Sequence, residues 1–293
     1  MANLPEISII GPGKVGTAIG VLAARAGWRV AAVAGRDSLA ARRAAERIGG
    51  GANACAPAEA AGAAELVLLT VTDDAIGPLC RGLAAQKVFR RGASVAHCSG
   101  ALAGDVLSAA RDACGCSVGS MHPLQTFPTV EAAVEKLPGA YFFIEGDDAA
   151  AARLASLATS IGGKAVRIAP QGKALYHAAA VTACNYLSAL LDGACRLGEK
   201  AGIEPATCLS ALAPLVRATV ENVFSMGPAE ALTGPIERGD VETVRRHIAA
   251  MRDCDGDLKS AYRAMGRLTV DLARRKGSIG PPIADELMEL LKG

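Results

Sequence analysis

Short apolar runs alternate with helical patterns over the first half of the chain. The runs that predict strands are Ile7–Ile10, Arg29–Ala34, Glu65–Thr72, Ala93–Cys98, Ser117–Met121, Tyr141–Ile144 and Ala165–Ile168. Most of them are separated by stretches with apolar residues at helical spacing, and strands that alternate with helices usually pair in parallel. The pattern therefore predicts an α/β fold with a doubly wound, mainly parallel sheet.

The second half of the chain shows helical periods only, over about residues 171–201, 205–225, 240–253, 257–275 and 281–292. A chain of 293 residues exceeds the usual size of a single domain, about 100 to 200 residues. We expect two domains that meet near Ala169 and Pro170. Residues 1–169 would form the α/β domain, and residues 170–293 an all-α C-terminal domain for substrate binding and dimerisation.

A glycine pattern directly follows the first predicted strand. In the spacing G-x-G-x-x-G, Gly11 would allow a sharp turn, Gly13 a close approach of backbone to pyrophosphate, and Gly16 tight packing of the following helix. The N-terminus of that helix favours an anion without any basic side chain. The strand, loop and helix together predict a Rossmann domain that binds a dinucleotide. The expected contacts are Gly11, Pro12, Gly13, Lys14, Val15 and Gly16.

The end of the second predicted strand favours NADP over NAD. NAD sites usually place an acid there for the ribose, whereas this chain has Ala34 and Gly35, followed by Arg36 and Ser38. A guanidinium pairs well with a 2′-phosphate. Asp37 leaves an alternative open, because it could contact a ribose or cap the next helix.

Composition excludes several partners. The net charge is only +2, and no block of like charge forms a stripe, so we expect neither nucleic acid nor a charged membrane surface as a partner. The nine cysteines lack paired metal-ligand spacing, which predicts free thiols and no metal site. Free thiols and the lack of a signal peptide before the first strand predict a cytoplasmic protein.

The stretch Ala174–Leu191 contains no charged residue and is just long enough to span a membrane. It includes His177, Asn185 and Tyr186, and this mixture favours a buried helix over a span in lipid. Its apolar residues occupy most of the helix circumference, more than a small helical domain can cover. We therefore expect a homodimer through the C-terminal helices.

Four segments carry a resemblance to a known family: His97–Leu102 (HCSGAL), Ser120–Phe127 (SMHPLQTF), Tyr176–Leu187 (YHAAAVTACNYL) and Ala231–Asp240 (ALTGPIERGD). With them the chain resembles Rossmann-like oxidoreductases that carry a C-terminal domain of unknown function. They belong to the 6-phosphogluconate dehydrogenase C-terminal-like superfamily, with ketopantoate reductase, pyrroline-5-carboxylate reductase and prephenate dehydrogenase. The resemblance covers nearly the whole chain and implies redox chemistry with NAD(P), without naming a substrate.

Polar residues follow two neighbouring strands where ligands bind in such folds, at the carboxyl ends. We expect Thr72 and Asp73, after one strand, and Ser99 and Gly100, after the next, to contact the cofactor, and His97 to bind substrate. A tight polar turn is an equally good interpretation of Ser99 and Gly100.

The proton donor is expected on the helix that begins the second domain. Lys173 and His177 are four residues apart and share a helix face, and Asn185 lies about three turns beyond Lys173. Related β-hydroxyacid dehydrogenases and ketopantoate reductase carry Lys-x-x-x-Asn here, with Lys as acid or base and Asn orienting the substrate. This chain has His in the Asn place, which leaves the acid open between Lys173 and His177, with Asn185 orienting. His122, in a segment that resembles the HPM-type segment of prephenate dehydrogenases, is the next candidate.

The segment Leu232–Asp240 contains two glycines and a proline and is predicted to be a loop. Glu237 and Arg238 are its only ionic pair and Thr233 its only hydroxyl, and all three are candidates for substrate binding, with Arg238 meeting a substrate anion. Alternatively, Asp240 could simply cap the next helix. Together these features predict an NADP(H)-dependent oxidoreductase that moves a hydride to or from a small carbonyl, imine or hydroxy acid. Two alternatives stay open: a non-catalytic NADP(H) sensor, and a deazaflavin-dependent NADP reductase.

Overall fold

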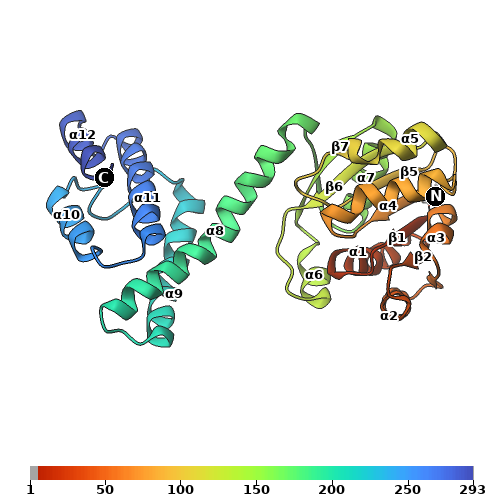
Figure 1. Ribbon diagram of the computed structural model, residues 1–293, viewed down its shortest axis with the longest axis horizontal. Coiled ribbons are helices and arrows are strands. Elements are labelled where there is room, and N and C mark those ends of the chain that lie inside the picture. Colours follow the sequence, from red (N-terminus) through yellow and green to blue (C-terminus); the bar gives the residue numbers. More distant parts are fainter. Residues whose placement is uncertain (1–5, 293) are drawn as a thin grey trace. The chain divides into compact units, whose positions relative to one another are not determined.

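The computed structural model describes residues 6–292, and the chain divides into two compact units after Cys184. The first unit contains an eight-stranded sheet in the order β3-β2-β1-β4-β5-β6-β7-β8 (Figure 1). Its strands are β1 Ile7–Ile10, β2 Val30–Ala34, β3 Asn53–Ala54, β4 Leu66–Leu69, β5 Ser94–His97, β6 Ser117–Pro123, β7 Tyr141–Gly146 and β8 Lys164–Arg167. All seven predicted strands are present, within a few residues at each end.

Neighbouring strands are parallel except at one place. β6 and β7 pair antiparallel, and β8 then pairs parallel to β7. The strand order reverses between β1 and β4, so the carboxyl ends of these two strands form the switch point at which open α/β sheets bind ligands. The predicted fold class is confirmed, with the reversed pair β7 and β8 as the part that is not parallel to the rest.

Helices cover both faces of the sheet and bury two separate apolar clusters. Side chains of α1, α2, α6 and α7 fill one cluster, and side chains of α3, α4 and α5 fill the other. Successive strand residues point to opposite faces, so Ile9 enters the first cluster and Ile10 the second. The helices are α1 Lys14–Arg25, α2 Ser38–Ile48, α3 Pro57–Ala63, α4 Asp73–Ala85, α5 Ser108–Cys114, α6 Val130–Lys136 and α7 Asp148–Ser160.

The second unit is helical, as predicted. It contains the later part of α8 Lys173–Lys200, then α9 Pro205–Met226, α10 Val241–Ala250, α11 Gly256–Lys276 and α12 Pro281–Leu290. Its apolar core joins α10, α11 and α12 through residues such as Val244, Val270 and Leu287. The division after Cys184 lies inside α8, because the first turns of this helix pack on the sheet of the first unit.

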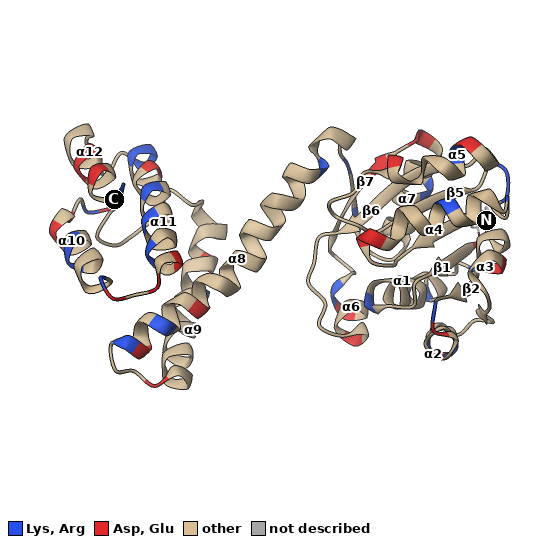
Figure 2. Cartoon of the chain, viewed as in Figure 1, with Lys and Arg blue, Asp and Glu red and all other residues tan. Residues whose placement is uncertain are grey.

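The long helix α8 is much less buried than the sequence led us to expect. Within residues 6–292, one segment, Pro170–Lys200, is long and apolar enough to cross a membrane by length and composition, and none of its apolar window is buried. Figure 2 shows that α8 carries hardly any charge between its start and its C-terminal part. The prediction of a buried helix is wrong for the single chain, since Tyr186 and Leu190 are exposed.

Candidate functional site

The three glycines of the predicted phosphate loop differ in the space around them. Gly11 has a φ of +119°, and a Cβ there would lie 2.6 Å from the carbonyl carbon of Thr70. A Cβ on Gly16 would collide with the Thr70 hydroxyl and the Gly11 carbonyl oxygen. Gly13, in contrast, faces open space and would meet no atom within 4 Å. Gly11 and Gly16 are therefore needed for the fold, and Gly13 leaves room for a ligand.

The N-terminus of α1 is free to bind an anion. Gly13 is its N-cap, no side chain accepts its first N–H groups, and its first turn contains no acid. Lys14 is exposed at its start. Pro12 packs against the end of β2, where a Cβ on Gly35 would lie 2.6 Å from the proline Cδ. Unpaired N–H groups at a helix start, beside an open backbone, are the physical requirement for phosphate binding.

The residues after β2 resolve the two interpretations of Asp37. Its carboxylate caps α2, accepting hydrogen bonds from the N–H groups of Leu39 at 2.8 Å and Ala40 at 3.2 Å. Arg36 and Ser38 are exposed. Because Asp37 is engaged with the helix backbone, Arg36 is the charged side chain left to meet a ligand at this strand end.

Arg36 also lies near the start of α4, across the switch point. A hydrogen bond from Thr72 lowers the pKa of Asp74, and the positive charge of Arg36 adds to that shift. Thr72 is the N-cap residue of α4, which begins at Asp73. The structure thus places the ends of β2 and β4 close enough for their side chains to interact.

A row of buried polar side chains crosses three strands. His97 on β5 pairs with Ser120 on β6, and Ser120 pairs with Glu145 on β7, so all three project from the same face. Lys173, the first residue of α8, reaches into this row, donates to Ser120 Oγ and lies 3.3 Å from Glu145 Oε1. Lys173 and Glu145 are each only 1% exposed. Burial lowers the pKa of Lys173, and the charge of Glu145 opposes that shift.

His97 has a structural role in place of the predicted substrate contact. Its Nδ1 accepts the N–H of Ser99 at 3.1 Å, so the hydrogen lies on Nε2, which is 3.2 Å from the carbonyl oxygen of Ala103. The side chain is fully buried, and burial lowers its pKa to about 3, with the charge of Lys173 adding to the shift. Both ring nitrogens are used by the backbone, so no group of His97 is left for a substrate.

Ser99 also forms a tight polar turn, the second of its two interpretations. Its hydroxyl donates to Asp73 Oδ2 at 2.8 Å and accepts the N–H groups of Ala101 and Leu102 at 3.1 and 3.0 Å. These bonds tie the turn after β5 to the start of α4. The hydroxyl is therefore occupied within the chain, while the backbone around Gly100 lies at the same strand end.

A second row of side chains lies nearer the end of β6. His122 pairs across the strands with Phe143, and Tyr176 of α8 covers both, with its hydroxyl 2.9 Å from His122 Nδ1 and its ring centroid 4.2 Å from that of Phe143. Burial lowers the pKa of His122 to about 4, with the charges of His177 and Lys173 adding to the shift. Burial also raises the pKa of Tyr176 to about 12. Near neutral pH, His122 is thus neutral, and its Nδ1 is hydrogen-bonded to the Tyr176 hydroxyl.

The imidazoles of His122 and of His177 on α8 both lie against Gly100. A Cβ on Gly100 would lie 2.5 Å from Cδ2 of His177 and 2.9 Å from Nε2 of His122. The ring centroids of the two histidines are 5.9 Å apart. Only glycine fits there, and His177, half-buried, lies at the carboxyl end of β5, where the fold binds its ligands.

The sequence identified Lys173, His177 and His122 as candidates for proton transfer, and in the structure these three residues lie in one site. It missed Ser120, Glu145 and Tyr176. Tyr176 could have been found, because it lies three residues after Lys173 and therefore on the same helix face. A lone acid at the end of the apolar run Tyr141–Glu145 was the signal for Glu145.

The other predicted substrate residues belong to the second unit. Asn185 is exposed on α8, two turns beyond His177. Glu237 pairs with Lys276 at 3.1 Å. Asp240 caps α10 by accepting the N–H and hydroxyl of Thr243, which is the second interpretation of that segment. The roles of Asn185, Thr233, Glu237 and Arg238 stay predictions.

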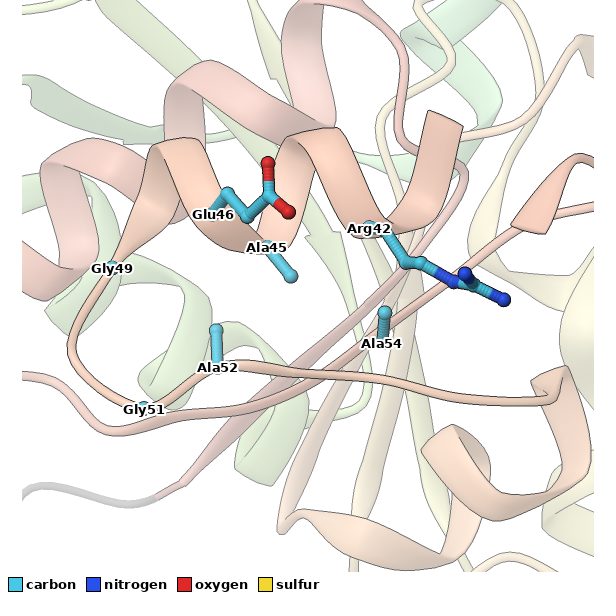
Figure 3. A pocket seen from close by; sticks show the side chains of 7 residues that line it. All are labelled: Arg42, Ala45, Glu46, Gly49, Gly51, Ala52 and Ala54. Carbon is cyan, nitrogen blue, oxygen red and sulfur yellow. The ribbon is translucent and has the colours of Figure 1, made fainter. Parts of the chain in front are cut away.

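A shallow groove of about 310 Å³ lies beside α2 (Figure 3). Arg42 and Glu46 border it from the helix, and Ala52 and Ala54 face them from β3 and the segment before it. It contains no residue of the glycine loop and does not belong to the predicted site.

All nine cysteines are free, and within residues 6–292 no cluster of His, Cys, Asp or Glu could hold a metal ion.

Two family models match successive parts of the chain. Residues 2–123 match a Rossmann-like domain, and residues 140–269 match a domain of unknown function, DUF2520. The chain is therefore a Rossmann-like protein with a C-terminal DUF2520 domain, which confirms the resemblance inferred from its motifs. Among curated proteins, none matches this chain.

Solved structures resemble the chain over nearly its full length. A protein of Thermotoga maritima is 26% identical, with a TM-score of 0.73 over 92% of this chain and 99% of its own. A Bacteroides fragilis protein, described as a candidate NADP oxidoreductase, is 25% identical, with a TM-score of 0.68 over 93% and 97%. An imine reductase from a Pseudomonas species, 15% identical, has a TM-score of 0.58 over 98% and 92%, and shares the fold.

Proposed function

We propose that this protein is an NADP(H)-dependent oxidoreductase that transfers a hydride to or from a small carbonyl, imine or hydroxy acid. The observation that carries the proposal is the glycine loop, where Gly13 opens onto free space before an uncapped helix N-terminus. The likeness to the Bacteroides fragilis protein described as a candidate NADP oxidoreductase supports it. The dinucleotide, when bound, supplies or accepts the hydride.

The chain's own residues fit a dinucleotide at the switch point. The loop from Gly11 to Gly16 and the first N–H groups of α1 would hold the pyrophosphate. Arg36, with Ser38 beside it, would meet the 2′-phosphate, since no acid occupies this strand end except Asp37, which caps α2. Thr72 and the backbone around Gly100 lie at the neighbouring strand ends and would contact the nicotinamide half.

Proton transfer is assigned to His177. Lys173, the other candidate, is 1% exposed, and its ammonium group is bound by Ser120 and Glu145. His177 is half-buried beside Gly100, and imidazole has an intrinsic pKa suited to proton transfer near neutral pH. His122, neutral near pH 7, would orient the substrate through its Nε2, which faces Gly100.

NADPH oxidation in the presence of a panel of carbonyls and cyclic imines tests the proposal. We expect turnover by the wild-type protein, and a loss of about 10²- to 10⁴-fold in His177→Phe with NADPH affinity unchanged. Asn185→Ala tests the orienting role predicted for that residue. Tight NADPH binding without oxidation of any compound would instead favour a sensor.

We also propose that the protein is cytoplasmic, that it forms a homodimer and that its substrate is a small molecule. Nine free thiols support a reducing compartment. The exposed apolar side chains of α8 and α9 support a second copy as the partner that covers them.

A further inference from the structure

The mechanism proposed above leaves a buried ion pair unused. Glu145 and Lys173 are almost completely buried, and burying two charges is costly unless each is fully satisfied. Here Glu145 Oε1 accepts three donors: the N–H of Gly104 at 2.8 Å, the hydroxyl of Ser120 and the ammonium of Lys173. Three donors on one oxygen hold the Glu145 carboxylate in a fixed position.

This ion pair is also a buried attachment of the start of α8 to the sheet. Among residues 173–184, which the first unit contributes to the helix, Lys173 is the only buried one, and Leu175 is 78% exposed. The remaining contacts of the first turns come from Tyr176 and His177. These two lie three and four residues after Lys173 and therefore on the same helix face. The buried Lys173 ammonium thus fixes where both side chains lie together with the contacts of Tyr176 with His122 and Phe143.

We propose that Glu145 is a positioning residue: through Ser120 and Lys173 it fixes the first turns of α8 and holds the His177 imidazole against Gly100, beside His122. The consequence for rate rests on the proposed function, whereas the placement of His177 does not. A proton donor that is misplaced by about an ångström loses much of its effect. Glu145 would therefore control turnover without contacting substrate or cofactor.

The placement can be measured by side-chain NMR, because the chain has only four histidines. The variants are Glu145→Gln, Lys173→Met and the double variant. We expect the His177 and His122 ring signals to change in each, because each removes the pair that holds the start of α8. His247, in the second unit, should keep its signal and serves as an internal control.

A matched control removes the same charge elsewhere. Glu131→Gln breaks the exposed pair of Glu131 on α6 with Arg47 on α2, in the same unit. It should leave the four histidine signals unchanged. If Glu145→Gln folds and the His177 and His122 signals stay as in the wild type, the inference is wrong. Should Glu145→Gln fail to fold, Ser120→Ala, which keeps both charges, must shift the same two signals, and unchanged signals there overturn it.

Rates separate this inference from the proposed function. Once a substrate is found, Glu145→Gln should lower kcat at least tenfold, with NADPH affinity within twofold of wild type. A rate loss in Lys173→Met with unmoved histidine signals would identify Lys173 as the proton donor and overturn the inference. If the wild type turns over no compound but the His177 signal still shifts in Glu145→Gln, the function fails and the positioning role stands.

Discussion

The two histidines on the sheet of the first unit differ from ordinary surface histidines because the protein keeps them neutral. Burial, with the charge of Lys173 adding to it, lowers the pKa of His97 to about 3, and burial lowers that of His122 to about 4. Both have hydrogen-bond partners that suit a neutral ring. The site therefore places uncharged imidazoles beside one buried cation, Lys173, and this arrangement has a measurable consequence for stability.

Stability should fall as the pH is lowered from about 6.5 toward 4. Between these values the unfolded chain binds protons on His97 and His122 that the folded chain does not, so unfolding becomes easier as protons are added. Each pKa unit corresponds to about 1.4 kcal/mol. The variant His97→Asn keeps an acceptor for the Ser99 N–H and removes one of these groups. Thermal unfolding at pH 7.5 and 5.0 should show a smaller pH effect in the variant, and an equal effect would contradict this account.

Arg36 is expected to select NADP over NAD. A charge-assisted contact is worth about 1.5 to 3 kcal/mol, which corresponds to roughly ten- to hundredfold in affinity. Arg36→Ala should therefore weaken NADPH binding by that factor and leave NADH binding nearly unchanged in titration calorimetry. Arg25→Ala, an exposed arginine at the far end of α1, is the control and should change neither. Wild-type protein that binds NADH as well as NADPH would show the assignment to be wrong.

Which residues the sequence could identify depended on whether they are neighbours along the chain. Lys173 and His177 share a helix face by spacing alone, so they could be paired without a structure. Ser120 and Glu145 meet only because β6 and β7 run antiparallel, in a register that the sequence does not reveal. The burial of Lys173, which decides between the two proton donors, follows from that unpredicted contact.

At the level of elements, the helices and strands were predictable because their apolar periods are long and uninterrupted. The strand β3 was missed, since its two residues, Asn53 and Ala54, are too short to show a period. The antiparallel direction of β7 could not be predicted either, because a buried strand has the same apolar run in either direction. The sequence predicted the glycine loop and a role for each of its three glycines. The structure shows how the roles of two of them can be tested separately.

Two glycines of the loop should respond to alanine in opposite ways. Gly13 has ordinary backbone angles and open space around it, so Gly13→Ala should fold with only a small loss of stability at this N-cap, while its methyl group obstructs the pyrophosphate. Gly16→Ala should unfold at a clearly lower temperature, because its Cβ collides with Thr70. Thermal unfolding and NADPH titration of both variants check this. If Gly13→Ala binds NADPH as tightly as the wild type, the pyrophosphate does not lie on this loop.

At the level of the whole molecule, the exposed apolar surface of α8 and α9 is the feature that a single chain leaves unexplained. Leu215 is 63% and Phe224 85% exposed, and Tyr186, Leu190 and Leu209 are exposed with them. The sequence showed that the side chains of α8 are largely apolar, but it could not show whether other helices of the same chain cover them. Large apolar side chains exposed in this number on two helices usually mark an interface between proteins.

We therefore expect a homodimer whose interface includes α8 and α9. The wild-type protein should have the mass of two chains by light scattering at micromolar concentration. Leu215→Asp and Phe224→Asp would each place a charge in the interface without a partner, and burying an unpaired charge costs several kcal/mol, so both should shift the protein toward one chain. Leu39→Asp, at a leucine on α2 in the first unit that is 52% exposed, should leave the mass unchanged. A wild-type protein with the mass of a single chain would exclude the dimer.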